Sequence, residues 1–160
     1  MQVKTIPIIF FTWTITTCCF AEQIAEYIRI PSKGPGFAID RTTNSVIVGD
    51  VGYDAKFCDA ENEFHCVVSK VFEFAVPRNS ILQNKWEFNG SIYKVIQRIR
   101  LRGERPALVI EKNGSPKIWY LWSTHRGLMM FDIKTREKQA GGLLLDGVCG
   151  FAASNGCIEN

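Results

Sequence analysis

The residues best suited to chemistry in this sequence are its cysteines, and their spacing favours structural bridges. Six cysteines are present, and the four that follow residue 21 form two pairs with a separation of eight positions each: Cys58 with Cys66, and Cys149 with Cys157. Several pairings are possible in an exported chain, and local pairing closes two short loops of equal length. His65 between the first two cysteines could instead help to bind zinc, but oxidation would compete with metal binding. The sequence therefore predicts two local disulfides and no bound metal.

Catalysis would need a base close to a nucleophile, and the chain has two histidines, His65 and His125. His125 lies in the turn-like run Ser123-Thr124-His125-Arg126-Gly127, where it could pair with Ser123 or with a distant aspartate. The chain has no Gly-x-Ser-x-Gly, His-Glu-x-x-His or glycine-rich phosphate-binding motif. The sequence therefore predicts a protein that has neither catalytic residues nor a cofactor. A small hydrolase that uses His125 is the alternative.

Three alternating carboxylates, Asp59, Glu61 and Glu63, fall within the loop that a disulfide between Cys58 and Cys66 would close. Their spacing resembles the start of a calcium-binding loop. However, phenylalanine replaces the glycine of the sixth position and lysine the glutamate of the twelfth. A clamped acidic loop fits better as a recognition element, because its charge attracts a basic partner and its rigidity lowers the entropy cost of binding. An acidic loop that is merely solvated is the alternative.

Arginine alternates with apolar residues at Arg98, Arg100 and Arg102. On a β-strand this period of two places all three arginines on one face, as a positive stripe. Arginine suits two-point contacts with carboxylates, so the stripe predicts contact with an acidic protein surface. A solvated outer face is the simpler alternative. Nucleic acid is not expected, because the formal charge of +3 falls to +2 without the single lysine of residues 1–21.

An aromatic run that resembles a strand precedes His125 and Arg126. Alternation along this strand would place Tyr120 and Trp122 on one face and Trp119 on the other. If Tyr120 and Trp122 point outward next to His125 and Arg126, the surface has the composition of a protein-binding hot spot. A strand that is buried on both faces is the alternative.

The elements that must position these residues begin after a segment typical of a signal peptide. Lys4 precedes an apolar, uncharged stretch at 6–15, and Cys19 and Ala21 occupy the small-residue positions of a cleavage site. We therefore expect residues 1–21 to be removed and residues 22–160 to form one β-rich domain with two local disulfides. No stable membrane anchor is expected.

Short apolar runs separated by turn residues predict a mainly β, antiparallel domain. Asn89-Gly90 and Asn113-Gly114 each lie between two such runs, and this dipeptide favours the positive φ angles of a tight hairpin turn. The runs amount to about eight strands, as expected for a sandwich, a barrel or a curved sheet. Ile24, Tyr27 and Ile28 have helical spacing, so one short N-terminal helix is also expected.

The composition, with 46% hydrophobic and 22% charged residues, is that of a globular domain and excludes a disordered or fibrous protein. The signal-like segment and the paired cysteines predict export, with the periplasm favoured and secretion as the alternative. These features together predict a protein-binding domain, such as an inhibitor or immunity-type protein that blocks a secreted toxin or hydrolase by occlusion. The alternatives are the small hydrolase that uses His125 and a structural component of envelope assembly.

Overall fold

The computed structural model describes residues 24–30, 36–100, 106–114, 117–134, 142–154 and 157. These residues form an antiparallel sheet of twelve strands and one short 3-10 helix, η1 (Ser80–Leu82). The predicted signal peptide, residues 1–21, lies outside the described residues. The strands are β1 (Ile24–Ile30), β2 (Phe37–Asp40), β3 (Ser45–Val48), β4 (Val51–Phe57), β5 (Phe64–Ser69), β6 (Glu73–Pro77), β7 (Lys85–Phe88), β8 (Ser91–Ile99), β9 (Ala107–Lys112), β10 (Lys117–Ser123), β11 (Gly127–Lys134) and β12 (Gly142–Leu145).

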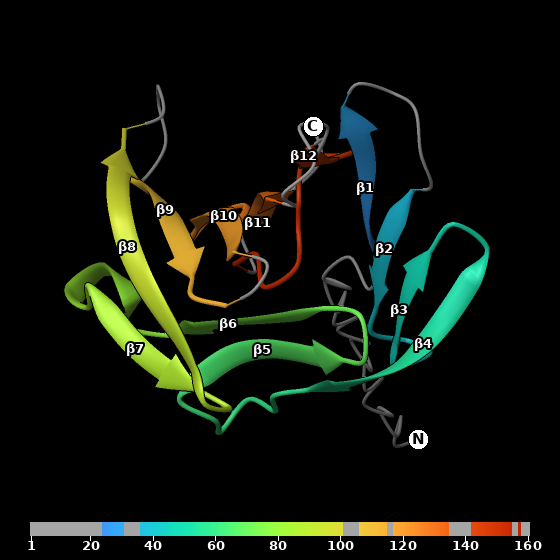
Figure 1. The fold of residues 1–160 in the computed structure, drawn as a ribbon, viewed down its shortest axis with the longest axis horizontal. Helices are drawn as coiled ribbons and strands as arrows, with labels where there is room; N and C mark the ends of the chain where they lie inside the picture. The colour runs from blue at the N-terminus through green and yellow to red at the C-terminus, as the bar shows by residue number, and fades with distance from the viewer. Residues whose placement is uncertain are drawn as a thin grey trace, which may run out of the picture.

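The sheet curls into a nearly closed barrel (Figure 1). Its strand order is β6-β5-β4-β3-β2-β1-β12-β11-β10-β9-β8-β7, so the two edges are β6 and β7, which follow each other in the chain. The Trp86 indole N–H of β7 donates to the Ala75 carbonyl oxygen of β6 at 3.0 Å and bridges these edges. The Tyr93 hydroxyl of β8, the strand next to β7, donates to Glu73 Oε1 of β6 at 2.9 Å. The prediction of a mainly β, antiparallel domain is confirmed, and its architecture is a barrel.

The predicted N-terminal helix is wrong, because this segment forms strand β1. Ala25 and Tyr27 point into the core with 5% and 1% of their surface exposed, whereas Ile24, Ile28 and Ile30 remain largely exposed. A period of two therefore prevails over the helical spacing of the apolar residues. The physical reason is tertiary, since β1 forms ladders with β2 on one side and β12 on the other, and both ladders satisfy its backbone hydrogen-bonding groups.

The predicted count of about eight strands is also wrong, since the described residues contain twelve. β1, β4 and β12 were not expected; β4 lies in an acidic segment and β12 has four residues, so neither shows a clear alternation. Residues 66–76, whose alternating apolar residues are typical of a single strand, are divided into β5 and β6 by a turn at Ser69. The Ser69 hydroxyl accepts hydrogen bonds from the N–H groups of Val71 at 3.3 Å and Phe72 at 3.0 Å, which reverses the chain there.

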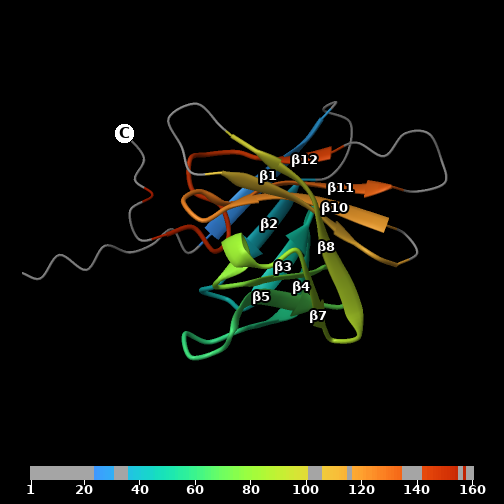
Figure 2. The same ribbon diagram turned by 90° about the vertical axis from the view of Figure 1, so that its left-hand side faces the viewer.

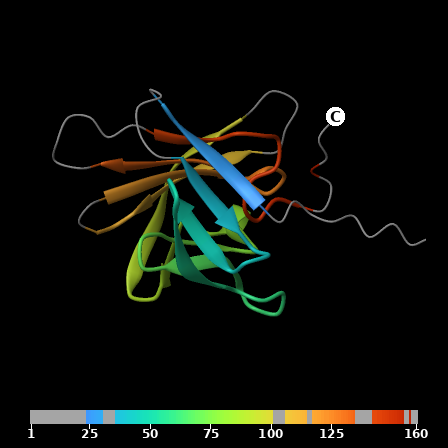
Figure 3. The same cartoon turned by 90° about the vertical axis from the view of Figure 1, so that its right-hand side faces the viewer.

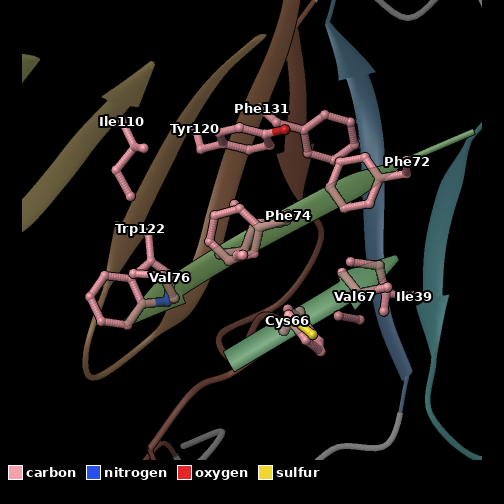
Figure 4. Packing of buried hydrophobic residues seen from close by; sticks show 14 of the residues in the cluster. Ile39, Cys66, Val67, Phe72, Phe74, Val76, Ile110, Tyr120, Trp122 and Phe131 are labelled. Atoms are coloured by element: carbon pink, nitrogen blue, oxygen red, sulfur yellow. The ribbon is translucent and has the colours of Figure 1, made fainter. Parts of the chain in front are cut away.

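The core is aromatic and lies between the β5–β6 hairpin and the wall formed by β10 and β11 (Figure 4). Phe74 packs against Tyr120 with ring centroids 5.0 Å apart, and Phe72 packs against Phe131 at 4.8 Å. Phe37 of β2 contacts Phe72 at 4.9 Å and Phe131 at 4.7 Å. Tilted and edge-to-face ring pairs add specific geometry to the burial of apolar area. The aromatic side chains of the hairpin therefore fill the interior of the barrel.

The connections between strands gather at two ends of the barrel, because neighbouring strands run in opposite directions. The turn 41–44, the loop 58–63, the turn 124–126 and the segment after β12 lie at one end, on the left in Figure 2 and on the right in Figure 3. The turn at Asn89-Gly90 lies at the other end and has the expected positive φ angles, 48° and 73°. Both pairs of predicted disulfide cysteines belong to the first end.

Candidate functional site

Two loops closed by disulfides meet at one end of the barrel, which we call the disulfide end. The first, the acidic loop, comprises residues 58–66, and the second, the C-terminal loop, comprises residues 149–157. The Cα atoms of Cys58 and Cys66 are 5.0 Å apart, and those of Cys149 and Cys157 are 5.8 Å apart, as usual for disulfides. The predicted local pairing is therefore confirmed, and disulfides of this kind point to an oxidising compartment.

The acidic loop presents its three predicted carboxylates to solvent. Asp59, Glu61 and Glu63 are exposed, and none of them forms an ion pair with another described residue. The loop is held by Arg78, whose guanidinium donates to the carbonyl oxygens of Asn62 at 2.7 Å and Asp59 at 2.9 Å. Because Arg78 binds main-chain oxygens and not the carboxylates, it fixes the loop and leaves the three negative charges available to a partner.

The C-terminal loop lies against the turn between β10 and β11. The Gly150 N–H donates to the Arg126 carbonyl oxygen and the Leu128 N–H donates to the Phe151 carbonyl oxygen, both at 2.8 Å. The Arg126 side chain donates in turn to the carbonyl oxygen of Val148 at 3.0 Å. The Phe151 side chain is 4% exposed and belongs to the core. Phe151 therefore anchors the described part of this loop in the core, unlike the acidic loop.

Glycine is required where the C-terminal loop and the turn touch. A Cβ on Gly150 would overlap the main chain of Leu128. Gly127 has a φ of 72°, and a Cβ there would overlap the main chain of Phe151 and Ala153. The absence of side chains at these two positions allows the two main chains to approach closely. The pair of glycines thereby sets the position of the C-terminal loop.

Arg41, in the turn between β2 and β3, joins the two disulfide loops. Its guanidinium lies 5.5 Å from the ring centroid of Phe57, next to the acidic loop, and 5.6 Å from that of Phe151, in the C-terminal loop. The two rings are themselves 5.7 Å apart. A cation over aromatic rings is attracted by their negative faces. Arg41 and the two rings therefore couple the positions of the two loops.

His65 lies within the acidic loop and is half-buried at the start of β5. Burial lowers the pKa of His65 to about 4, and the positive charges of Arg78 and Arg41 contribute to the shift. The imidazole is therefore uncharged at neutral pH. Within the part of the chain that the structure describes, no group of three or more His, Cys, Asp or Glu residues is arranged to hold a metal ion.

His125 meets a different serine from the one considered from the sequence. Its Nδ1 lies 3.3 Å from Ser154 Oγ in the C-terminal loop, whereas Ser123 Oγ accepts a hydrogen bond from the Arg126 N–H at 2.9 Å. The Ser154 N–H also donates to the His125 carbonyl oxygen at 3.1 Å. These contacts attach the C-terminal loop to the turn. A hydroxyl next to an imidazole is also the arrangement of a nucleophile and its base.

The predicted outward position of Tyr120 and Trp122 is wrong. They are 1% and 2% exposed and point into the core. The Tyr120 hydroxyl donates to the Glu73 carbonyl oxygen at 2.7 Å, and burial raises the pKa of this phenol. Trp119 occupies the outer face and donates its indole N–H to Glu111 at 3.0 Å. The sequence predicted that the residues of this strand alternate between two faces, but it did not predict which face is buried. Tyr120 and Trp122 therefore cannot contact a partner in this fold.

The predicted arginine stripe is only partly within a strand. Arg98 is exposed near the end of β8, Arg100 is exposed just after this strand, and Arg102 lies outside the described residues. The Arg98 guanidinium donates to Asn84 Oδ1 at 2.8 Å, ahead of β7. Arg98 therefore holds the connection before β7 and has fewer donors available for a partner than the sequence suggested.

Sequence reasoning missed the residues that organise the disulfide end, above all Arg41 and Arg78. Each is a lone arginine at the end of a strand, so neither its spacing nor its neighbours could indicate a contact with distant loops. It also missed the ion pair between Lys112 and Glu73, at 2.8 Å, which the Tyr93 hydroxyl completes with its hydrogen bond. The available signal in the sequence was that these two charged residues stand next to the core residues of β6 and β9.

No protein-family model matches this chain, and neither a curated protein nor a solved structure shows significant similarity to it. Within the described ranges, no helix is long and apolar enough to cross a bilayer. The case for a function therefore rests on the geometry and the charges of the disulfide end.

Proposed function

We propose that this chain is an exported protein-binding domain whose acidic loop recognises a basic surface of its partner. The class that fits best is an inhibitor or immunity-type protein that blocks a secreted toxin or hydrolase by covering its active surface. The periplasm is the favoured location, and secretion is the alternative. The observation that carries the proposal is the way Arg78 holds the acidic loop by its main-chain oxygens while the carboxylates remain exposed.

The physical argument for binding is preorganisation. A loop that is already ordered loses little conformational entropy when a partner binds, and three unpaired carboxylates raise the rate of encounter with a positive surface. The acidic loop is ordered by its disulfide and by Arg78, and Arg41 couples it to the C-terminal loop. These contacts support a surface whose shape is fixed before the partner arrives.

The test is co-purification of a partner from an extract of the exported fraction. The wild-type chain is expected to recover one protein in near-stoichiometric amounts. The variant Asp59→Asn/Glu61→Gln/Glu63→Gln is expected to recover at least about tenfold less, because the steering charges are lost. The recovered complex is also expected to weaken as the salt concentration rises.

A matched control removes three other exposed carboxylates, in the variant Asp50→Asn/Asp54→Asn/Glu87→Gln. This variant has the same change in net charge but an intact acidic loop, so it is expected to recover the partner as the wild type does. Equal recovery by both variants would contradict the assignment of the acidic loop. Recovery of no partner under any condition would contradict a binding function.

A small hydrolase is the second candidate, because Ser154 Oγ lies 3.3 Å from His125 Nδ1. A nucleophile and a base at this distance could act in acyl transfer. His125→Ala would then abolish hydrolysis of ester or peptide substrates and leave the thermal unfolding unchanged. If the wild type hydrolyses no ester or peptide substrate, the contact between Ser154 and His125 is structural.

A further inference from the structure

The outer face of the sheet carries a row of apolar side chains that crosses five neighbouring strands. We call Ile28, Leu144, Met130, Leu121 and Val109 the apolar row, because each is the direct register partner of the next. Ile28 is 47% and Leu144 is 37% exposed, and the other three are partly exposed. The solvated face of an antiparallel sheet is normally polar. A continuous apolar row on this face is typical of a surface that another molecule covers.

On the outer face, beside the apolar row, Gly142 in β12 has no side chain, and we call this position the notch. Gly142 is the register partner of Ile30 in β1, which is 50% exposed. The register between β11 and β12, continued by one position, places Asp132 on the other side of Gly142. Among the described residues, a Cβ on Gly142 would meet only Met130 at 3.8 Å and the Phe131 carbonyl oxygen at 4.0 Å, which are ordinary contacts. The notch therefore has room for a Cβ, with Ile30 as its neighbour in β1 and, by the continued register, Asp132 as its neighbour in β11.

Asp132 is half-buried, and one of its two carboxylate oxygens lacks a partner among the described residues. Its Oδ1 is shielded from solvent and has no hydrogen-bond partner within the described residues. The nearby donors are directed elsewhere, since the Trp119 indole and the Lys117 ammonium both bind Glu111, at 3.0 and 3.1 Å. A carboxylate next to apolar side chains is best satisfied by lysine or arginine, whose aliphatic stem packs on the apolar surface while the cation reaches the carboxylate.

The borders of the apolar row are acidic where it crosses β1 and β12. Glu26 and Asp146 are exposed on one side, next to Ile28 and Leu144, and the Asp146 N–H donates to the Glu26 carbonyl oxygen at 2.8 Å. Asp132 lies on the opposite side. A second copy of this chain would bring acidic borders together, and anionic lipid would be repelled by them. The charges instead fit an apolar ridge that is flanked by basic residues.

We propose that the apolar row is a docking surface for a basic amphipathic helix of a protein partner, with one lysine or arginine of this helix placed in the notch at Gly142 to reach Asp132. Five strands at the usual spacing make the row about 19 Å long, which matches about 13 residues of helix. Such a helix would contribute apolar residues at i, i+4, i+7 and i+11. This surface is separate from the acidic loop and does not depend on the function proposed for that loop.

The test uses a synthetic amphipathic peptide of about 15 residues, with leucine on one face and lysine on both borders of this face. A second peptide carries glutamate in place of every lysine. Fluorescence anisotropy of each labelled peptide is measured against the whole protein. The lysine peptide is expected to bind at least about tenfold more tightly than the glutamate peptide, because the borders of the row are acidic.

Three variants of the protein test where the lysine peptide binds. Met130→Ser/Leu144→Ser removes apolar contacts at the surface and is expected to weaken the lysine peptide at least about fivefold. Asp132→Asn is expected to reduce the preference for the lysine peptide by a similar factor. Ile81→Ser/Leu82→Ser is the matched control, since it removes two exposed apolar side chains on η1, and it is expected to leave binding unchanged. Thermal unfolding of each variant establishes that it is folded.

Four results would overturn the proposal. They are no binding of the lysine peptide at about 1 mM, an equal loss of binding in the η1 control, an unchanged peptide preference in Asp132→Asn, and flotation of the protein with vesicles of phosphatidylcholine and phosphatidylglycerol. Self-association that Met130→Ser/Leu144→Ser abolishes would assign the row to a second copy instead. The variant that neutralises the acidic loop is expected to bind the lysine peptide normally, so failure of one proposal is distinguishable from failure of the other.

Discussion

The acidic loop and the C-terminal loop have the same cysteine separation, eight positions, but they are built for opposite tasks. The acidic loop extends into solvent, with Asp59, Glu61 and Glu63 exposed and its main chain held by Arg78. The C-terminal loop turns inward and inserts Phe151 into the core. Equal spacing of cysteines therefore predicts equal covalent geometry, but it does not predict whether the closed loop displays residues or completes the fold.

The difference arises from what lies opposite each loop. The C-terminal loop meets Gly127 and belongs to a contact between two main chains, which no side chain separates. The acidic loop meets an arginine side chain, which can follow the loop if it moves. We therefore expect the C-terminal loop to contribute mainly to stability, and the acidic loop to contribute mainly to binding.

The largest effect is expected from Gly150→Ala. The new Cβ would overlap the Leu128 main chain, which cannot move without breaking the β11 ladder, so we expect a loss of at least about 3 kcal/mol in the free energy of unfolding. Urea denaturation followed by tryptophan fluorescence measures this loss. The control is Gly52→Ala, because a Cβ at Gly52 meets no atom within 4 Å, and it is expected to change stability by less than about 0.5 kcal/mol. Equal stability of the two variants would show that the C-terminal loop is not docked as described.

Removal of each disulfide should give the next largest effect. Cys58→Ala/Cys66→Ala and Cys149→Ala/Cys157→Ala open loops of equal length, so we expect each to lose about 2–3 kcal/mol through the entropy of the unfolded chain. Their consequences for binding should differ, because the first frees the acidic loop and the second does not. Urea denaturation measures the stability of both variants. A negligible loss in either variant would contradict a structural role for that bridge.

Much of this fold could be predicted from local patterns. The disulfide pairs and the hairpin turn at Asn89-Gly90 depend on residues that are close in the sequence, and local chemistry determines them. The helix predicted around Tyr27 failed because the choice between helix and strand there depends on pairing with β12, which is more than a hundred residues away. Non-local pairing of this kind leaves no trace in local spacing.

The sequence predicted the exposed charges of the candidate site, but it did not predict the contacts that hold the site together. Asp59, Glu61 and Glu63 are exposed in a clamped loop, as expected from the sequence. Tyr120 and Trp122 were assigned to the wrong face, because strict alternation is compatible with either orientation and the rest of the barrel decides which face is covered. A contact such as that of Arg78 with a distant loop could not be predicted, since it exists only once β6 lies beside the acidic loop.

His65 should make stability depend on pH in the mildly acidic range. Burial lowers its pKa in the folded state to about 4, from an ordinary value near 6.5, so the unfolded chain binds the proton more readily. The contribution is fully present above about pH 6.5 and is lost as the pH falls toward 4. Since His65 is only half-buried, we expect a loss of about 1–2 kcal/mol.

The measurement is urea denaturation of His65→Gln and wild type between pH 7 and pH 4. The variant is expected to lose less stability than the wild type over this interval, because glutamine does not titrate. An unchanged slope in His65→Gln would assign the acid sensitivity to other groups.

Arg78→Lys is expected to have the smallest effect on stability. It also tests most directly how the acidic loop differs from the C-terminal loop. Lysine keeps the positive charge but cannot reproduce the contacts of the guanidinium with the carbonyl oxygens of Asn62 and Asp59. We expect a loss of about 1 kcal/mol in the free energy of unfolding, together with faster cleavage after Glu61 or Glu63 by a glutamate-specific protease. Cleavage followed by mass spectrometry locates the change.

The matched control for this prediction is Arg98→Lys, since Arg98 is also an exposed arginine that holds a connection, through Asn84. In this control variant, the protease is expected to cleave the acidic loop at the same rate as in the wild type. Faster cleavage in Arg78→Lys alone, with a loss of only about 1 kcal/mol in stability, would mean that one side chain orders the acidic loop and that the rest of the fold depends little on it. Equal cleavage rates in both variants would mean that the disulfide alone orders the acidic loop, as the core and the two glycines order the C-terminal loop.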